Sequence, residues 1–100
     1  MTPADDQYIQ LLAQNKMVHD ADFNDCNEAA EGRWFANQVS TAPHPLDKAK
    51  SLVKMVTDTT SMKSDQAEWE VESAVYVYAP QTIPKLKDEA AQQPPPPPAT

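Results

Sequence analysis

A run of acidic and amide side chains between positions 20 and 31 could bind a calcium ion. The stretch has twelve residues, and positions one, three, five, seven, nine and twelve of it have the ligand spacing of an EF-hand loop. The residues at these positions are Asp20, Asp22, Asn24, Cys26, Glu28 and Glu31. Position six, normally the glycine of a sharp turn, is Asp25, and position eight, normally apolar, is Asn27. An acidic helix N-terminus, favoured by the helix dipole, explains the same residues and is the preferred interpretation. Calcium binding by Asp20–Glu31 is the alternative.

The histidines and the single cysteine are the other residues with catalytic or metal-binding chemistry. His19 and His44 fall in expected connectors without the HExxH or CxxC context of zinc sites, so we expect them at the surface. His19, Asp20 and Cys26 could form a nucleophile system, but no oxyanion turn or pocket-forming sheet is predicted beside them. We therefore expect no enzyme, no cofactor and no metal ligands.

Aromatic residues are the strongest candidates for binding. Trp69 and Tyr76 are seven residues apart and share one side of a predicted helix. They either widen its buried face or form an exposed patch, and Trp and Tyr dominate protein binding hot spots. The expected partner-binding residues are Trp34, Phe35, Trp69 and Tyr76.

The charge of the chain excludes some partners. Fifteen acidic residues against eight basic ones give a net charge of −7, the wrong sign for neutralising nucleic-acid phosphates. The apolar runs are far shorter than the roughly 20 residues that cross a bilayer. With an acidic N-terminus and no apolar signal core, the chain is expected to be either cytoplasmic or the mature form of a secreted protein.

The chain contains one glycine, which argues against a hairpin-rich β protein and favours helices. The first predicted helix begins at Pro3 with Thr2 as its N-cap and ends near Lys16. Its inner face is formed by Tyr8, Leu11 and Leu12.

The second predicted helix starts near Asp20 or Asp22. Spacings of three and four residues define its apolar face. That face comprises Phe23, Cys26, Ala30 and Trp34. Gly32 either ends this helix or is tolerated within it, up to about Val39, at a cost near 1 kcal/mol.

Two more helices follow. The third starts at Pro45, and the fourth has Ser64 as its N-cap and stops at Pro80. Their inner faces are Leu46, Ala49, Leu52, Val53 and Val56 in the third, and Ala67, Val71, Ala74, Val75 and Tyr78 in the fourth. The alternation of Val75–Tyr78 also suits a strand, but no second strand is predicted to pair with it. Residues 81–100 are expected to form a flexible tail, whose Pro94–Pro98 run is either a spacer or a ligand for an aromatic groove.

Several short motifs together resemble a known family. They are an acidic start before a Leu-containing helix, Cys26 six residues before Gly32, Asp65-Gln66-Ala67, and the run from Ala74 to Gln81. This pattern, over roughly residues 5–82, resembles the small mycobacterial secreted domains called domain of unknown function 732. The resemblance implies a helical, exported domain whose cysteine pairs with one in a final Tyr-Cys-Pro. Ala79 stands at that position here, so a relative that lost both bridge and signal, such as a phage-borne protein in the host cytoplasm, would fit.

These observations predict an all-α bundle of four short helices over residues 1–80. The expected function is that of a non-enzymatic protein-protein interaction module from an actinobacterium or its phage. The resemblance favours secretion, whereas the unpaired Cys26 favours a reducing cytoplasm.

Overall fold

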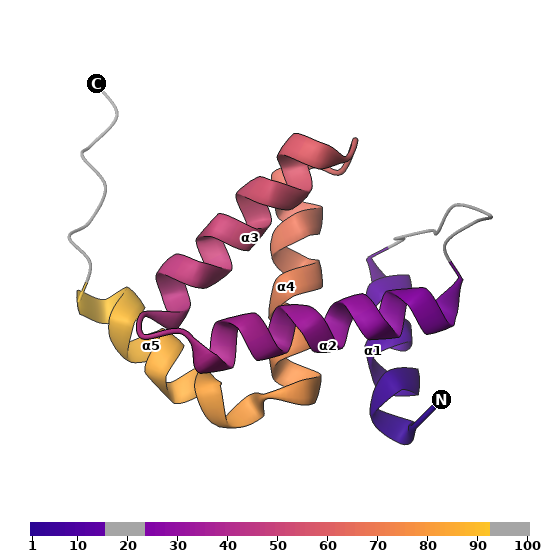
Figure 1. Ribbon diagram of the computed structural model, residues 1–100, viewed down its shortest axis with the longest axis horizontal. Helices are drawn as coiled ribbons and strands as arrows, with labels where there is room; N and C mark the ends of the chain where they lie inside the picture. Colours follow the sequence, from indigo (N-terminus) through magenta and orange to yellow (C-terminus); the bar gives the residue numbers. More distant parts are fainter. Residues whose placement is uncertain (16–23, 93–100) are drawn as a thin grey trace.

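The computed structural model describes residues 1–15 and 24–92, and the regular structure in these ranges is entirely helical (Figure 1). The elements are α1 (Pro3–Gln14), α2 (Asp25–Thr41), α3 (Pro45–Thr59), α4 (Ser64–Tyr78), a 3-10 turn η1 (Pro80–Thr82) and α5 (Ile83–Gln92). The all-α class is confirmed. Five α-helices rather than four are present in the described ranges, so the expected count was wrong.

The starts of α1 and α2 follow from local capping. The Thr2 hydroxyl accepts a hydrogen bond from the Asp5 backbone N–H at 3.2 Å, and the Asp5 carboxylate accepts one from the Thr2 N–H at 3.1 Å. This capping box satisfies two donors that the first turn would otherwise leave unpaired. Asn24 caps α2 by accepting from the Asn27 N–H at 3.0 Å.

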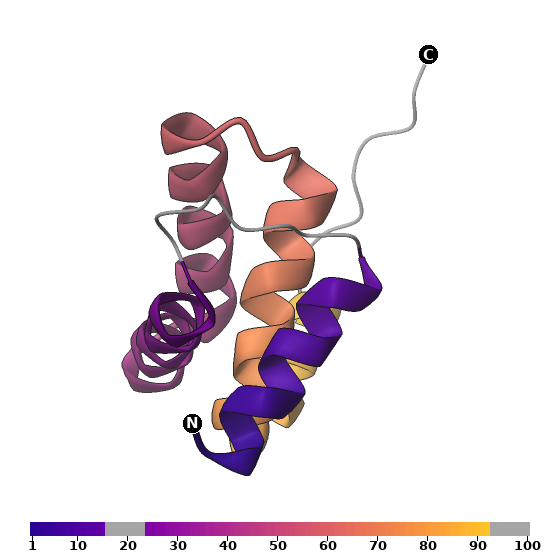
Figure 2. The same cartoon turned by 90° about the vertical axis from the view of Figure 1, so that its right-hand side faces the viewer.

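Helix α4 is the centre of the bundle. It lies between α3 and α1, and α2 crosses over it (Figures 1 and 2). The core therefore draws side chains from all four longer helices. Its buried members are Tyr8, Leu12, Phe35, Val39, Leu52, Val56, Ala67, Val71, Ala74 and Val75. The run Val75–Tyr78, which could have been a strand, is helical.

The buried face of α2 differs from the predicted one. Cys26, Ala30 and Trp34 are exposed, and Phe23 lies outside the described residues. The face turned inward is instead Glu28, Ala29, Gly32, Phe35, Ala36 and Val39. Apolar spacing alone missed this face because two of its members are a glutamate and a glycine.

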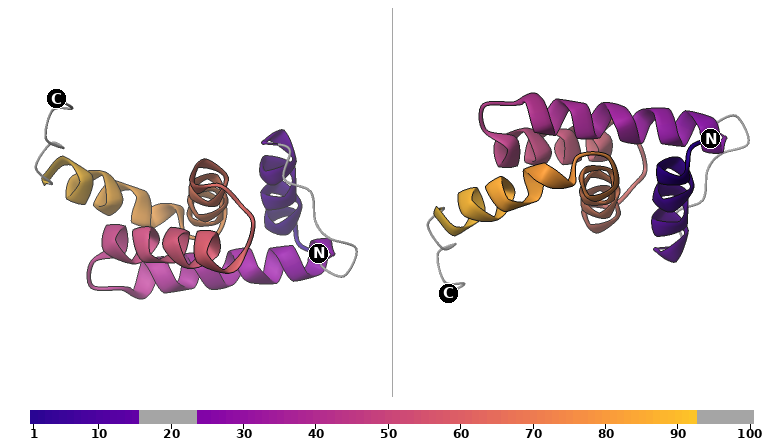
Figure 3. Two further views of the ribbon diagram at one scale, coloured as in Figure 1. Left: turned by 90° about the horizontal axis from the view of Figure 1, so that it is seen from above. Right: turned by 90° about the horizontal axis from the view of Figure 1, so that it is seen from below.

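Residues 81–92 also differ from the prediction, because they form η1 and α5 rather than part of a flexible tail. Helix α5 packs beside the start of α3 (Figure 3). Ile83 and Leu86 pack against the core, and a Glu89 carboxylate oxygen accepts a hydrogen bond from the Leu46 backbone N–H at 3.3 Å. The helical domain thus extends to at least Gln92. Residues 93–100, including the proline run, lie outside the described residues.

Candidate functional site

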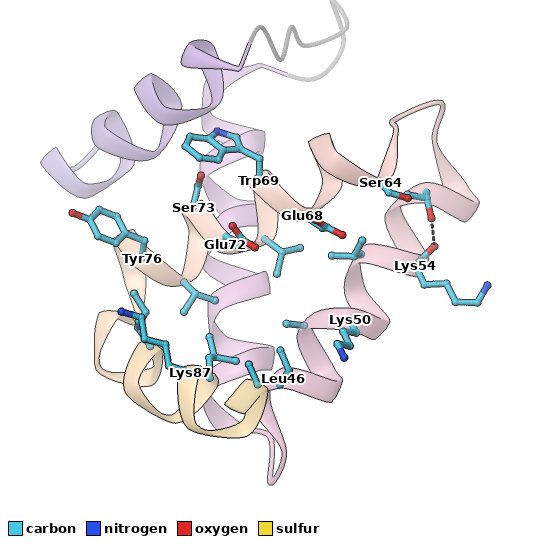
Figure 4. A pocket seen from close by; sticks show the side chains of 18 of the residues that line it. Leu46, Lys50, Lys54, Ser64, Glu68, Trp69, Glu72, Ser73, Tyr76 and Lys87 are labelled. Carbon is cyan, nitrogen blue, oxygen red and sulfur yellow. Dashed lines mark hydrogen bonds between the residues drawn. The ribbon is translucent and has the colours of Figure 1, made fainter. Parts of the chain in front are cut away.

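A large groove of about 1180 Å³ lies between α3, α4 and α5 (Figure 4). Its walls are mainly aliphatic and aromatic side chains from these three helices. The aliphatic ones are Leu46, Ala49 and Val53 of α3, Val71 and Val75 of α4, and Ile83 and Leu86 of α5. Such a surface loses ordered water when an apolar partner covers it, which favours binding.

The charged residues that border the groove differ in sign between its helices. Glu68 and Glu72 project from α4, whereas Lys50 and Lys87 come from α3 and α5 (Figure 4). Desolvation, and then the negative charge of Glu68, raise the pKa of Glu72. The rim is thus acidic along α4 and mainly basic along the other two helices, where Asp58 of α3 is paired with Lys54.

Trp69 forms one wall of the groove and also holds two helices together. Its indole Nε1–H donates a hydrogen bond to the Leu11 carbonyl oxygen at 2.7 Å. Leu11 is in the last turn of α1, where carbonyl groups lack a partner within the helix. Trp69 therefore has a structural role as well as a place in the groove.

The four predicted binding residues do not form one patch. Tyr76 lines the groove and is 55% exposed. Trp34 is 44% exposed but lies on α2, away from the groove lining. Phe35 is only 1% exposed and packs in the core, so it cannot meet a partner at the surface. The structure brings Trp69 and Tyr76 to one groove and separates Trp34 and Phe35 from it.

The predicted calcium loop is not formed by the part of it that the structure describes. Residues 25–31, positions six to twelve of the loop, belong to α2 and so cannot wrap around an ion. Asp20 and Asp22 lie outside the described residues, as does His19. His44 is exposed as expected, with its Nδ1 3.5 Å from a Glu89 carboxylate oxygen. Cys26 is exposed.

A second candidate site lies inside the bundle, where acidic side chains of α2 and α4 meet. Glu28, Glu31 and Glu70 each place a carboxylate oxygen within 4.8 Å of the others. Glu28 and Glu70 are buried and Glu31 is half-buried. Desolvation, a hydrogen bond to Glu31 and the charges of Glu28 and Glu31 raise the pKa of Glu70 to about 9. Carboxyl groups buried this closely cannot all stay ionised without a compensating positive charge.

Comparisons with protein-family models, curated proteins and solved structures find no match to this chain. No helix in the described ranges is long and apolar enough to cross a membrane.

The sequence reasoning missed most of the groove, and of the acidic cluster it named Glu28 and Glu31 but not Glu70. Helix α5 supplies one groove wall, and its signal was the spacing of three, then four residues between Ile83, Leu86 and Ala90, with Pro84 near the helix start. The acidic cluster joins residues about forty positions apart. Glu28 and Glu70 share no local pattern, so only the tertiary packing reveals it.

Proposed function

We propose that this chain is a non-enzymatic interaction module that binds an amphipathic helix of a partner protein in the groove between α3, α4 and α5. The observation that carries the proposal is the continuous apolar floor of that groove, open to solvent and formed by three helices. An amphipathic helix buries its apolar stripe in such a groove through residues spaced at i, i+3, i+4 and i+7.

The size of the groove favours a peptide over a small molecule. Pockets for small ligands typically measure about 300 to 1000 Å³ and enclose most of the ligand. This groove is about 1180 Å³ and lies open along the bundle (Figure 4). A helix with its side chains is roughly 10–12 Å across, so one further helix could lie in the groove between α3, α4 and α5.

The rim charges specify the partner helix further. Basic residues on one flank of the partner's apolar stripe would meet Glu68 and Glu72, and acidic residues on the other flank would meet Lys87. Such complementarity contributes mainly to orientation and to the rate of association. Tyr76, exposed at the edge, is the expected hot spot because tyrosine combines apolar area with a hydroxyl.

The test uses a displayed library of 16-residue peptides selected on the full chain, with affinities measured by fluorescence polarisation. We expect an apolar i, i+3, i+4, i+7 consensus flanked by acidic and basic residues. Tyr76→Ala should weaken the selected peptides at least about thirtyfold, which corresponds to the hot-spot threshold of about 2 kcal/mol. Trp34→Ala, which removes an exposed aromatic outside the groove, is the matched control and should change affinity less than about twofold.

A charge swap checks the orientation. Lys87→Glu should weaken binding, and changing the facing acidic residue of the peptide to lysine should restore it. Sensitivity to Trp34→Ala without sensitivity to Tyr76→Ala would refute the groove as the site. Sedimentation of the free chain as a dimer that Tyr76→Ala dissociates would instead assign the groove to a second copy.

An origin in an actinobacterium or its phage is a further part of this proposal. It rests on the resemblance of the sequence to domain of unknown function 732.

A further inference from the structure

The second candidate site is independent of the groove and concerns the carboxylates between α1, α2 and α4. Glu28 and Glu31 are three residues apart on α2, so they lie on one side of that helix. Glu70 reaches the same point from α4. Three acidic side chains from two helices thus converge in a region that is closed to solvent on the Glu28 and Glu70 sides.

Tyr8 of α1 gives an independent indication that something belongs in this space. Its side chain is fully buried, and among the described residues its hydroxyl oxygen has no hydrogen-bond partner. A Cβ at Gly32 would lie 2.7 Å from Cζ of Tyr8, so the hydroxyl end of the ring lies against α2 next to Glu31 and one turn after Glu28. Burial, and then the negative charges of Glu70, Glu28 and Glu31, raise the pKa of Tyr8. A buried polar atom without a partner is rare in native proteins and often marks an ion or water site.

Glu70 contributes a second buried oxygen atom that lacks a hydrogen-bond partner. The residue is 2% exposed, and within residues 1–15 and 24–92 its Oε1 also lacks a hydrogen-bond partner. Two buried oxygen atoms without partners, one of them from a carboxyl group, therefore accompany three converging carboxylates.

We propose that Glu28, Glu31, Glu70 and the Tyr8 hydroxyl form a binding site for one calcium-sized divalent cation inside the bundle. Oxygen ligands of calcium lie at about 2.3–2.6 Å from the ion, so two ligands of one ion are at most about 5 Å apart. The carboxylate oxygens of the cluster, all within 4.8 Å of one another, can share such an ion. A ligand set made only of oxygen atoms favours calcium, magnesium or manganese over zinc or copper.

This site differs from the EF-hand that the sequence suggested. It takes only Glu28 and Glu31 from that stretch, and both act from within a helix. The ion would reach them from the side of Glu31, which is half-buried. The competing occupant is a proton shared between Glu70 and Glu31, and the experiment has to separate the two.

The experiment measures the melting temperature of the full chain in chelator and then in millimolar CaCl2, with calorimetric titration for stoichiometry. A cation that binds only the folded state should raise the melting temperature by on the order of 10 °C at about a hundred times its dissociation constant, with one ion per chain. Glu70→Gln should abolish most of this rise. Glu68→Gln, an exposed glutamate two residues earlier on α4, is the matched control and should keep it.

Two further variants keep the test decisive if Glu70→Gln does not fold. Tyr8→Phe retains the buried ring, and Glu31→Gln alters the half-buried ligand; each should weaken calcium binding at least several-fold. MgCl2 should bind less tightly, since magnesium requires oxygens at about 2.0–2.1 Å in a stricter geometry. An unchanged melting temperature in CaCl2, or an equal rise in wild type and all three cluster variants, would assign the cluster to proton sharing and overturn the proposal.

Discussion

At the scale of single residues, Asp5 joins three helices through one carboxylate. Its Oδ1 accepts hydrogen bonds from Arg33 Nη1 of α2 and from the Tyr78 hydroxyl of α4, each at 2.6 Å. The same side chain completes the capping box at the start of α1. Asp5 lies in the first turn of the helix that the sequence predicted from Pro3, but its tertiary partners are residues 28 and 73 positions away.

Replacing Asp5 should therefore cost stability. We expect Asp5→Asn to lower the free energy of unfolding by about 2 kcal/mol at pH 7, because hydrogen bonds to an ionised buried acceptor contribute about 1.5–3 kcal/mol. Urea denaturation measures the loss. Asp6→Asn, in the same turn but exposed, should stay within about 0.5 kcal/mol of wild type; equal losses in both variants would show that only the helix dipole matters.

The same residue should make stability fall in acid. The Tyr78 hydrogen bond is the main cause that lowers the pKa of Asp5 from 3.8 to about 2. Because the folded pKa lies below the unfolded one, the stabilisation is complete above about pH 4 and is lost as the pH falls towards 2. Melting temperatures measured from pH 5 to pH 2 should drop less steeply in Asp5→Asn than in wild type. Parallel curves would contradict this assignment.

Glu70 should have the opposite effect on the pH dependence. Its folded pKa is raised from 4.5 to about 9, so its contribution is most favourable below pH 4.5 and declines as the pH rises to 9. The groups that face it are Glu28 and Glu31 of α2 and Tyr8 of α1. In chelator, Glu70→Gln should be more stable than wild type at pH 8, with little difference at pH 4. A deficit at pH 8 would mean that the carboxyl group is needed for packing.

Gly32 allows α1 and α2 to approach closely. A Cβ at this position would lie 2.5 Å from Cε2 and 2.7 Å from Cζ of the Tyr8 ring. We expect Gly32→Ala to destabilise the fold by about 1–2 kcal/mol, because overpacking costs more than the roughly 1 kcal/mol that alanine gains in helix propensity. The loss should disappear when Tyr8 is also replaced by leucine, as a double-mutant cycle in urea would show. A stabilised single variant would mean that the ring moves aside freely.

At the scale of elements, apolar spacing predicted α3 and α4 well but misjudged α2 and α5. Most buried residues of α3 and α4 are aliphatic, so their period of three to four positions is visible in the sequence; Glu70 and Ser73 of α4, which are also buried, do not belong to that pattern. In α2 the inward face includes Glu28 and Gly32. Apolar spacing does not predict burial of a glutamate, and a glycine suggests the end of a helix. Helix α5 is short and rich in charged residues, and its few apolar side chains find a packing partner only because α3 lies beside them.

Helix α5 should contribute measurably to stability. Leu86 is half-buried against the core, so Leu86→Ala should lower the free energy of unfolding by about 1–2 kcal/mol, less than a fully buried leucine would. Asp88→Ala changes an exposed position of the same helix and should leave it nearly unchanged. Chemical denaturation of both variants tests this. Equal stability of the two variants would mean that residues 81–92 contribute no more to stability than a flexible tail would.

At the scale of the whole molecule, α4 connects the two candidate sites. Its Val71 and Val75 are buried in the core and also line the groove, whereas Glu70 faces the acidic cluster. Because α1, α2 and α3 all pack on α4, we expect the helices to unfold together. In a Trp34→Phe variant, the fluorescence of Trp69 and the far-ultraviolet circular dichroism should give the same urea midpoint. A lower midpoint by fluorescence would show that α1 detaches first.

The indole of Trp69 has a consequence for how occupancy of the groove is sensed. One edge of the ring is a wall of the groove, and its N–H holds the final turn of α1 through the Leu11 carbonyl. A bound peptide that displaces this ring must either preserve the hydrogen bond to the Leu11 carbonyl or release the end of α1. Peptide binding in the groove and fraying at the end of α1 are thus thermodynamically linked, so backbone amide exchange in residues 12–14, which are not part of the groove lining, would report the bound peptide.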